Sequence, residues 1–294
     1  MTFKKQVLSA FAAAILFSIP VAARENPFQS ASSSGRMVKT PVVCTTTHLS
    51  TIVEAVSDGR FETRTIIPFG MCPGHFDLSP GEARKLLETP LLLYHGYEQF
   101  LKGIEFGKGT KKLQVDIKGN WMIPDLHSNA VWKITAILSG LQPVYSGEFD
   151  TRATQYVAAV KTSADSLRAC LNQYRGTPVV CSGMNRDFAE WMGFRVVAEY
   201  PRDEDVSIKT MRDIIAVSHS RGVKLVLDNK QSGGKTGRTI AESIASPMVV
   251  LTNFPETDLP YSSGYPYIRT LTDNCASVVS ALNQTSRGGR KNIQ

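Results

Sequence analysis

The sequence predicts an α/β protein with two lobes, each containing a parallel four-stranded sheet flanked by helices, and three observations support this fold class. Short apolar or β-branched runs are bounded by glycine and proline, which is typical of strands. Stretches with helical spacing of apolar residues separate these runs, and strands that alternate with helices form parallel sheets. The same order occurs in both halves of the 294-residue chain, a length that suits two domains of roughly 100–150 residues.

The first half contains four predicted strands and two predicted helices. The strands are expected at Thr40–Thr47, Thr63–Pro68, Pro90–Gly96 and Lys112–Ile117, and the helices at 49–59 and 79–89. In the second helix Ser79 can cap the N-terminus, Pro80 suits the first turn, and Glu82 completes a capping box.

The second half repeats this order. Strands are expected at Thr177–Gly183, Phe194–Pro201, Val223–Asn229 and Pro247–Pro255, and helices at Asn185–Gly193, Val206–His219 and Thr236–Ser246. Both halves therefore predict the same kind of sheet, with helices as the crossover connections.

Between the halves, residues 149–176 are predicted to form one long helix, because apolar residues keep helical spacing from Ala153 to Tyr174. Asp150 is expected to cap its start and Gly176 to end it. One interpretation is an ordinary packing helix. The other is a rigid helix that joins two lobes, with a ligand cleft between them at the carboxyl ends of the strands.

The N-terminus reads as a secretory signal peptide over residues 1–23. Lys4 and Lys5 form its charged region, Val7–Ile19 its apolar region, and small residues precede a cleavage site near Ala23. The apolar run is shorter than the roughly 20 residues that span a bilayer. We therefore expect an exported, periplasmic protein, with a retained membrane anchor as the alternative.

Composition and charge exclude some function classes. The chain is 42% hydrophobic and 20% charged, as in ordinary globular proteins. Loss of residues 1–23 removes two lysines and no acid, so the net charge falls from +7 to +5. The sequence contains no basic run interleaved with aromatic residues, so this modest positive charge does not indicate a nucleic-acid partner. Separately, we expect the protein to be a monomer.

These features together predict the domain organisation. It comprises a signal peptide (1–23), a flexible lead-in (24–38), an N-terminal lobe (39–148), the linker helix (149–176), a C-terminal lobe (177–286) and a basic tail (287–294). The five cysteines allow disulfides in an oxidising compartment, but an odd number leaves at least one thiol unpaired, and the pairing stays open.

Side chains able to bind a ligand follow several predicted strands. They are His48 after the first strand, Met71, Cys72 and His75 after the second, and Ser182, Met184, Asp228 and Asn253 at strand ends of the second half. The loop "GMCPGHFDLSP" contains a Cys-x-x-His spacing among prolines and glycines that exclude a helix. This spacing is either part of a metal site or an ordinary turn.

The chain resembles a family, the zinc- and manganese-binding solute receptors of bacterial ABC importers, over most of its length after residue 38. The resemblance lies in "VVCTTTHLSTIVEAV", in "IIPFGMCPGHFDLSPGEARKLLETPLLLYHGYEQFL" and in "DEDVSIKTMRDIIAVSHSRGVKLVLDN". It implies two α/β lobes joined by one long helix, with a metal ion in the cleft.

The resemblance also implies where the metal ligands stand, and there this sequence departs from the family. The first ligand histidine of the family falls on Gly74, with His75 one residue later. The second is similar to His127, the third falls on Ser182, and the fourth, usually Asp, falls on Asn253. Neutral Ser and Asn are poor substitutes for imidazole and carboxylate as zinc ligands.

The predicted ligand set is therefore His75, His127, Cys72 and His48, with Asp228, Ser182, Asn253, Met71 and Met184 as possible accessory residues. A Cys–His–His set suits zinc or copper, and the sulfur favours softer ions. His95 is expected to be a core or supporting residue, and Asp228 either orients a ligand histidine or caps a loop.

We expect a periplasmic receptor that delivers a divalent metal to an inner-membrane ABC permease and performs no reaction. Zinc is favoured, with manganese, cobalt or copper as other ions. One alternative keeps the fold but binds a metal chelate or small polar ligand instead of a bare ion. The other is an enzyme with Cys72 as nucleophile, for which the sequence indicates no oxyanion hole.

Overall fold

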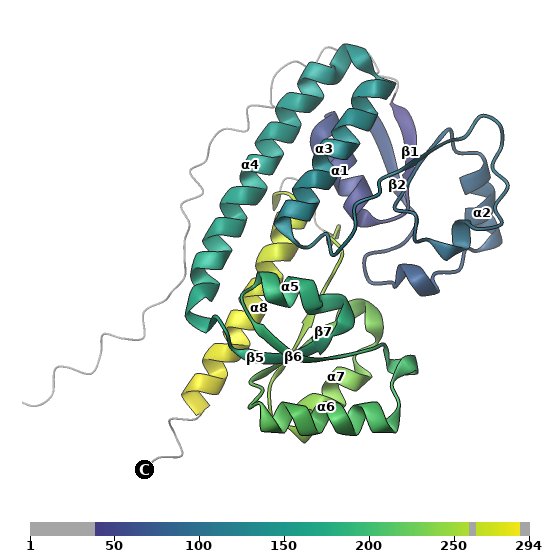
Figure 1. Cartoon of the computed structure of the whole chain (residues 1–294). Helices are drawn as coiled ribbons and strands as arrows, with labels where there is room; N and C mark the ends of the chain where they lie inside the picture. Colours follow the sequence, from purple (N-terminus) through teal and green to yellow (C-terminus); the bar gives the residue numbers. More distant parts are fainter. Residues whose placement is uncertain (1–38, 259–262, 289–294) are drawn as a thin grey trace, which may run out of the picture. The chain divides into compact units, whose positions relative to one another are not determined.

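A computed structural model of the chain describes residues 39–258 and 263–288 (Figure 1). The predicted signal peptide (1–23), the lead-in (24–38) and the part of the basic tail beyond Gly288 lie outside the described residues. None of the described helices is both long and apolar enough to cross a membrane.

The first sheet has the order β2-β1-β3-β4, and all its strands are parallel. The strands are β1 (Thr40–Cys44), β2 (Phe61–Thr65), β3 (Leu91–Tyr94) and β4 (Lys111–Gln114), and the helices of this half are α1 (Thr47–Ser57), α2 (Pro80–Leu87) and α3 (Pro124–Leu141). The predicted capping box of α2 is present: Ser79 Oγ accepts the Glu82 backbone N–H, and the Glu82 carboxylate accepts the Ser79 N–H.

The second sheet repeats this topology with the order β6-β5-β7-β8, again with parallel strands. Its elements are β5 (Pro178–Ser182), β6 (Arg195–Tyr200), β7 (Leu225–Asn229), β8 (Met248–Leu251), α5 (Arg186–Trp191), α6 (Ile208–Ser220) and α7 (Lys235–Ser243). The predicted two-lobed α/β class is therefore confirmed.

Short 3₁₀ turns lie at many of the junctions between these elements. They are Pro73–His75, Gln99–Leu101, Pro143–Tyr145, Asn172–Tyr174, Gly183–Asn185, Asp203–Asp205 and Lys230–Ser232. Five of them follow strands β2, β3, β5, β6 and β7 and so shape the sheet edge at which the cleft is expected.

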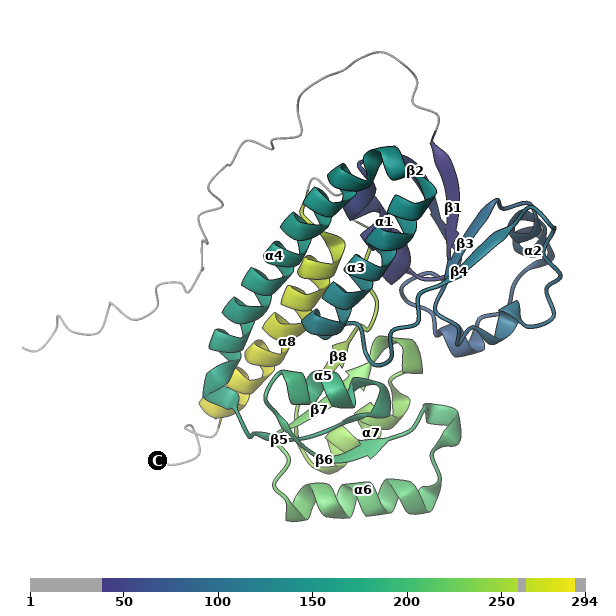
Figure 2. The ribbon, with the colours of Figure 1, turned by 45° about the horizontal axis from the view of Figure 1, so that its top comes forward.

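The long helix α4 covers Ser146–Leu171, so its predicted bounds were shifted. The turn Pro143–Tyr145 leads directly into it, and Asp150 lies inside the helix instead of capping it. A second long helix, α8 (Pro266–Gly288), was not predicted, nor was α3. Figures 1 and 2 both show α8 lying alongside α4.

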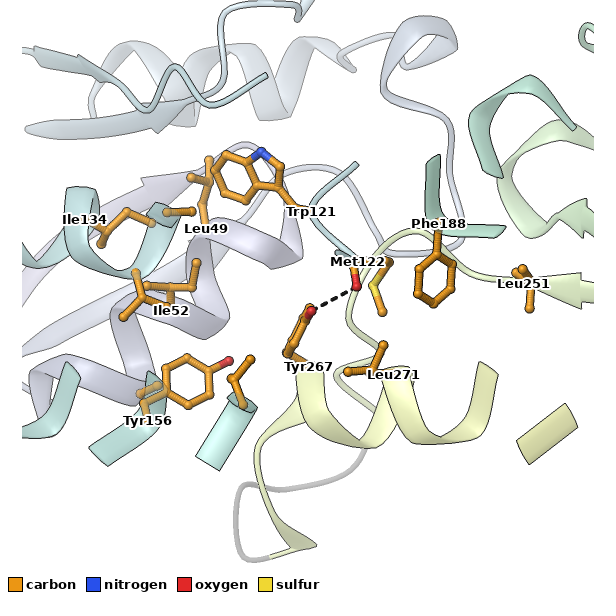
Figure 3. Packing of buried hydrophobic residues seen from close by; sticks show 14 of the residues in the cluster. Leu49, Ile52, Trp121, Met122, Ile134, Tyr156, Phe188, Leu251, Tyr267 and Leu271 are labelled. Carbon is orange, nitrogen blue, oxygen red and sulfur yellow. Dashed lines mark hydrogen bonds between the residues drawn. The ribbon is translucent and has the colours of Figure 1, made fainter. Parts of the chain in front are cut away.

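One hydrophobic cluster extends through both lobes. It includes Leu49 and Ile52 of α1, Tyr156 of α4, Phe188 of α5, and Tyr267 and Leu271 of α8 (Figure 3). The Tyr267 hydroxyl donates to the Met122 carbonyl oxygen at 3.0 Å, which ties α8 to the segment before α3. Because α4 and α8 share buried side chains with both sheets, we expect only small movements of one lobe against the other. The predicted lobe boundaries stay a prediction.

Candidate functional site

A cavity of about 640 Å³ lies where the carboxyl ends of the strands of both sheets meet. Residues at or just after the end of each described strand line this cavity: His48 after β1, Cys72–Gly74 after β2, His95 and Tyr97 after β3, Gly119–Trp121 after β4, Gly183 and Met184 after β5, Arg202 after β6, Asn229 at the end of β7 with Gln231 and Ser232 after it, and Asn253 and Phe254 after β8. This is where open parallel sheets bind ligands, and the volume is that of a small-molecule site.

The lining is mostly uncharged. Five carboxamides of the described residues contribute, from Gln99, Asn120, Asn229, Gln231 and Asn253, together with aromatic side chains, two imidazoles and the Cys72 thiol. The charged side chains among the described lining residues are those of Arg202 and Asp187. The cavity thus offers many neutral hydrogen-bonding groups and aromatic faces.

His48 begins the site, in the first turn of α1. Its Nε2 donates to the Asn253 carbonyl oxygen at 2.8 Å, a contact between the two lobes, and this leaves Nδ1 unprotonated in the neutral ring. Burial, and secondly the nearby His95, lower the pKa of His48 to about 3. The ring is therefore neutral at physiological pH, and its Nδ1 has no hydrogen-bond partner among the described residues.

His95, expected to be a core or supporting residue, also lines this cavity. Its Nε2 lies 2.8 Å from the Thr46 hydroxyl, and its ring lies 4.4 Å from that of Trp121 and stacks on Tyr97 at 4.8 Å. Burial lowers the pKa of His95 to about 3. Its position directly after β3 was the signal in the sequence that could have identified it.

The turn that carries His95 is fixed by the buried carboxylate of Glu98. This carboxylate accepts the backbone N–H groups of His95 and Gly96 at 2.8 and 2.7 Å, and the Thr45 hydroxyl at 2.5 Å. Both carboxylate oxygens are therefore used to hold the turn, so Glu98 positions His95 and Tyr97 instead of facing the cavity.

His127 is fully buried in α3 and does not line the cavity. Its Nε2 lies 2.9 Å from the Tyr156 hydroxyl, and its ring stacks on Tyr267 at 3.5 Å. Burial, with a smaller effect from His48, holds its pKa well below the usual range. The rings of His127 and His48 lie 5.8 Å apart, so His127 stands behind His48 in the core.

His75 lies in the turn after β2 with its side chain about half exposed. Its Nε2 is 2.9 Å from Arg202 Nη1 and 3.3 Å from Glu204 Oε1, both on the loop after β6. Its neighbours Cys72 and Gly74 line the cavity, whereas His75 itself does not. Met71 is also exposed and lies outside the lining.

Gly74 has a packing reason to be glycine. A Cβ atom built on it would lie 3.0 Å from Arg202 Nη2 and 3.4 Å from Nη1. A methyl group at position 74 would therefore crowd the Arg202 guanidinium and displace it slightly.

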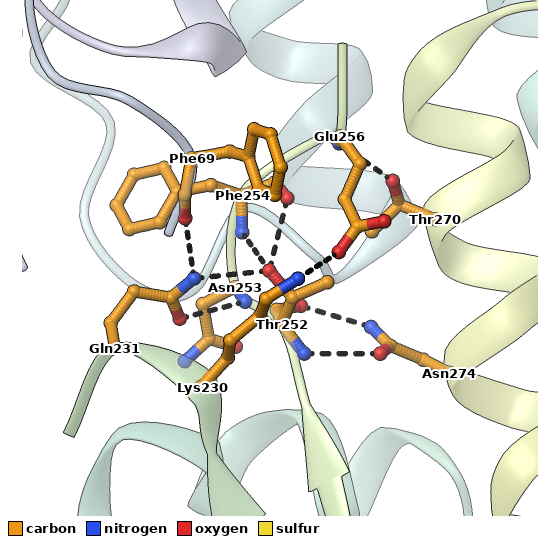
Figure 4. A network of polar contacts seen from close by, with 9 residues as sticks. All are labelled: Phe69, Lys230, Gln231, Thr252, Asn253, Phe254, Glu256, Thr270 and Asn274. Atoms are coloured by element: carbon orange, nitrogen blue, oxygen red, sulfur yellow. Dashed lines mark hydrogen bonds and ion pairs between the residues drawn. The ribbon is translucent and has the colours of Figure 1, made fainter. Parts of the chain in front are cut away.

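Asn253 joins elements of both lobes through its carboxamide. Its Oδ1 accepts from Asn120 Nδ2 at 2.9 Å, and its Nδ2 donates to the Met184 carbonyl at 3.3 Å and to Asn229 Oδ1 at 3.2 Å. Its backbone N–H donates to Gln231 Oε1, as Figure 4 shows. The same network connects the lobes again, because Gln231 Nε2 donates to the Phe69 carbonyl at 2.6 Å.

The remaining predicted residues divide between the cavity and the sheet behind it. Met184 lines the cavity. Ser182 and Asp228 are buried at their strand ends and do not line it. Asp228 Oδ1 accepts the backbone N–H of Asn229, and burial raises the pKa of this carboxyl.

The structure thus brings some of the predicted ligands together and separates others. His48, Cys72, Met184 and Asn253 share the cavity, whereas His127, Ser182, Asp228, Met71 and His75 do not line it. Within residues 39–258 and 263–288, no three His, Cys, Asp or Glu side chains are grouped so that they could hold a metal ion. All five cysteines are free thiols, and Cys44, Cys181 and Cys275 are buried.

Comparison with solved structures shows the same fold in periplasmic metal-binding proteins. A cadmium-bound periplasmic metal-binding protein from Candidatus Liberibacter asiaticus is 18% identical, with a TM-score of 0.70, and the match covers 83% of this chain and 100% of that one. A manganese-bound mutant from the same organism is 19% identical with a TM-score of 0.71, over the same shares of the two chains. A zinc-bound deletion mutant of ZnuA is 14% identical with a TM-score of 0.68, and the match covers 83% and 98%.

Comparison with curated proteins gives no match. The profile of one protein family, described as the periplasmic component A of the zinc-uptake complex (ZnuA), matches residues 42–281, which include both sheets and the cavity. Since this match spans most of the chain, the family is established. The chain belongs to the ZnuA family of periplasmic zinc-uptake components.

Proposed function

We propose that the chain is a periplasmic receptor that captures a transition metal as a small complex and delivers it to an inner-membrane ABC permease. Family membership supports the receptor role and the periplasmic location, because the family is that of a periplasmic uptake component. The chelated form of the metal is the part that the cavity itself supports. The chain performs no reaction in this proposal.

The main observation behind the proposal is that the Asn253 side chain takes part in hydrogen bonds within the protein. The resemblance puts the family's fourth ligand, a carboxylate, at this position. In this chain the Asn253 carboxamide instead hydrogen-bonds to Asn120, Met184 and Asn229, and so links the lobes. Around it lies a cavity of about 640 Å³, far larger than a bare ion needs and lined by neutral donors, acceptors and aromatic faces.

Capture would follow from this geometry. A bound complex would replace its water contacts with hydrogen bonds to carboxamides, and its organic part would pack on Trp121, Tyr97 and Phe254. The imidazoles of His48 and His95 are neutral, as they must be to accept a hydrogen bond or bind a metal. The shared hydrophobic cluster would limit closure to a small shift of the lobes.

A bare divalent ion is the second candidate, and the family description and the cadmium-, manganese- and zinc-bound neighbours favour it. Zinc would be the preferred ion, with manganese, cobalt or copper as others. His75, His127, Cys72 and His48 would be the ligands, with the accessory residues named above. This candidate requires His127 to leave Tyr156 and Tyr267, and His75 to leave Arg202.

Titration calorimetry on the chain purified from the periplasm distinguishes the two candidates. The probes are aqueous zinc, and zinc complexed by nitrilotriacetate or by tris(2-aminoethyl)amine. In Met184→Trp the larger side chain would fill the cavity from its partly exposed position, and Val144→Trp is the matched control outside it. We expect a complex to bind at about 10 µM or tighter, which is roughly 7 kcal/mol, and to lose binding only in Met184→Trp.

The opposite pattern would support the bare ion. Aqueous zinc bound at about 1 µM or tighter, and lost in His75→Ala and His127→Ala, would overturn the proposal in favour of the second candidate. If no zinc species binds more tightly than about 1 mM, both metal candidates fail.

A further inference from the structure

Arg202 is the positively charged residue of the described cavity lining. It follows β6, lines the cavity, and places its guanidinium directly against Gly74, where a Cβ atom would lie 3.0 Å from Nη2. Gly74 stands where the family resemblance puts the first histidine ligand. A permanently charged cation therefore lies directly beside the position at which the resemblance puts a metal ligand.

Among the described residues, no carboxylate forms an ion pair with the Arg202 guanidinium. Its Nη1 donates to Nε2 of His75 at 2.9 Å. Arg202 can donate five N–H bonds in a planar fork, so most of its donors remain for another partner.

The acidic residues near Arg202 have other contacts. Glu204 lies against His75 at 3.3 Å, and Asp203 accepts the backbone N–H groups of Lys235 and Thr236 at 3.1 and 2.8 Å. Asp187 lines the same cavity without an ion pair to Arg202. Arg202 is thus a cationic side chain of the described lining that has no carboxylate bound to it and could bind an anionic group of a ligand.

We propose that Arg202 binds a carboxylate group of the captured ligand, and that Gly74 is required because it makes room for the guanidinium. The ligand class is therefore a small carboxylate-bearing molecule, taken up either free or as its transition-metal complex. This inference rests on the proposed function for the site, but not on the metal itself. A guanidinium favours planar, two-oxygen contact with a carboxylate and repels an uncoordinated metal cation.

A matched pair of tripodal zinc complexes tests this inference. Nitrilotriacetate presents carboxylates, whereas tris(2-aminoethyl)amine presents only amines and leaves the complex cationic. Binding of both complexes, and of metal-free nitrilotriacetate, is measured by calorimetry for the full chain and its variants. Arg202→Gln removes the charge, and Gly74→Ala moves the guanidinium while keeping it. Arg221→Gln removes an exposed cation at the end of α6 as the control.

We expect zinc–nitrilotriacetate to bind about tenfold to a hundredfold more weakly in Arg202→Gln, because a charge-assisted hydrogen bond is lost, and to weaken in Gly74→Ala as well. Arg221→Gln should bind like the unmodified chain. The amine complex should bind weakly and be insensitive to Arg202. Thermal unfolding of each variant establishes that it is folded, and the contact at Gly74 is with the end of a flexible side chain, so Gly74→Ala should fold.

The experiment can contradict the receptor function and the carboxylate-binding role of Arg202 independently of each other. If zinc–nitrilotriacetate binds equally well with and without Arg202, the receptor function stands and the role of Arg202 is overturned. If metal-free nitrilotriacetate binds as tightly as its zinc complex, with the same dependence on Arg202, the carboxylate site stands and capture of a metal complex fails. Preference for the amine complex, or no binding of nitrilotriacetate in either form below about 1 mM, overturns the carboxylate site.

Discussion

Acidification provides the sharpest test of the environment around His48 and His95. Burial lowers the pKa of both imidazoles to about 3, against an ordinary value of about 6.5. In the unfolded chain both rings take up a proton as the pH falls through 6.5, whereas in the folded chain they stay neutral until the pH nears 3. The folded state is thus fully favoured above about pH 6.5 and loses stability as the pH falls.

The size of this loss follows from proton linkage. Between pH 7 and pH 5, each histidine lowers the free energy of unfolding by about 2 kcal/mol, and the two together by about 4 kcal/mol. His127 acts in the same direction, because burial also lowers its pKa. For a domain whose total stability is about 5–15 kcal/mol, this effect is large.

The assay is urea denaturation followed by tryptophan fluorescence at pH 7, 6 and 5, in buffer with a metal chelator. The double variant His48→Gln, His95→Gln removes both groups. From pH 7 to pH 5, the free energy of unfolding should therefore decrease by about 4 kcal/mol less in this variant than in the unmodified chain. His219→Gln, which changes an exposed residue in the last turn of α6, serves as the control.

The comparison uses the change with pH, so any pH-independent cost of the substitutions cancels. Equal pH dependence in the double variant and the unmodified chain would refute the argument, because the two rings would then titrate alike in the folded and unfolded states.

Three further substitutions test the contacts that build the site. Asn253→Ala should lower the free energy of unfolding by about 1–3 kcal/mol in urea denaturation, because Asn120 and Asn229 lose a part-buried hydrogen-bond partner, whereas Asn283→Ala, at an exposed pair with Tyr174, should cost less. Glu98→Gln should also cost about 1–3 kcal/mol, since one oxygen that accepts a backbone N–H becomes a donor; an unchanged midpoint would contradict the role of Glu98 in holding the His95 turn. Ser79→Ala should cost about 1 kcal/mol through loss of the α2 cap, and thermal unfolding should detect it, while equal stability would show that the capping box is not needed.

The sequence alone determined the local elements and the class of fold. Each of the eight strands in the described residues overlaps a predicted strand, because short β-branched runs between glycines and prolines favour strands wherever they occur. Parallel pairing followed from the helices between them, and the Ser79 capping box from three-residue spacing. The expectation that ligands bind at the carboxyl ends of parallel strands also located the cavity, since these strands end at one edge of each sheet. The helices α3 and α8 were missed, although their residues also carry helical patterns, and α8 buries Tyr267 and Leu271 against segments far away in the chain.

Only the tertiary structure decided what each candidate residue contacts. The resemblance puts the family's second ligand histidine at His127, yet Tyr156 and Tyr267, 29 and 140 positions away, enclose this residue in the core. The Arg202 guanidinium lies against Gly74, and Asn253 bonds to Asn120 across the lobes. Periodicity and turn signals are local, because they depend on neighbours along the backbone. Burial, hydrogen bonding and charge at a site depend on residues brought together through space, and these contacts define what the cavity can bind.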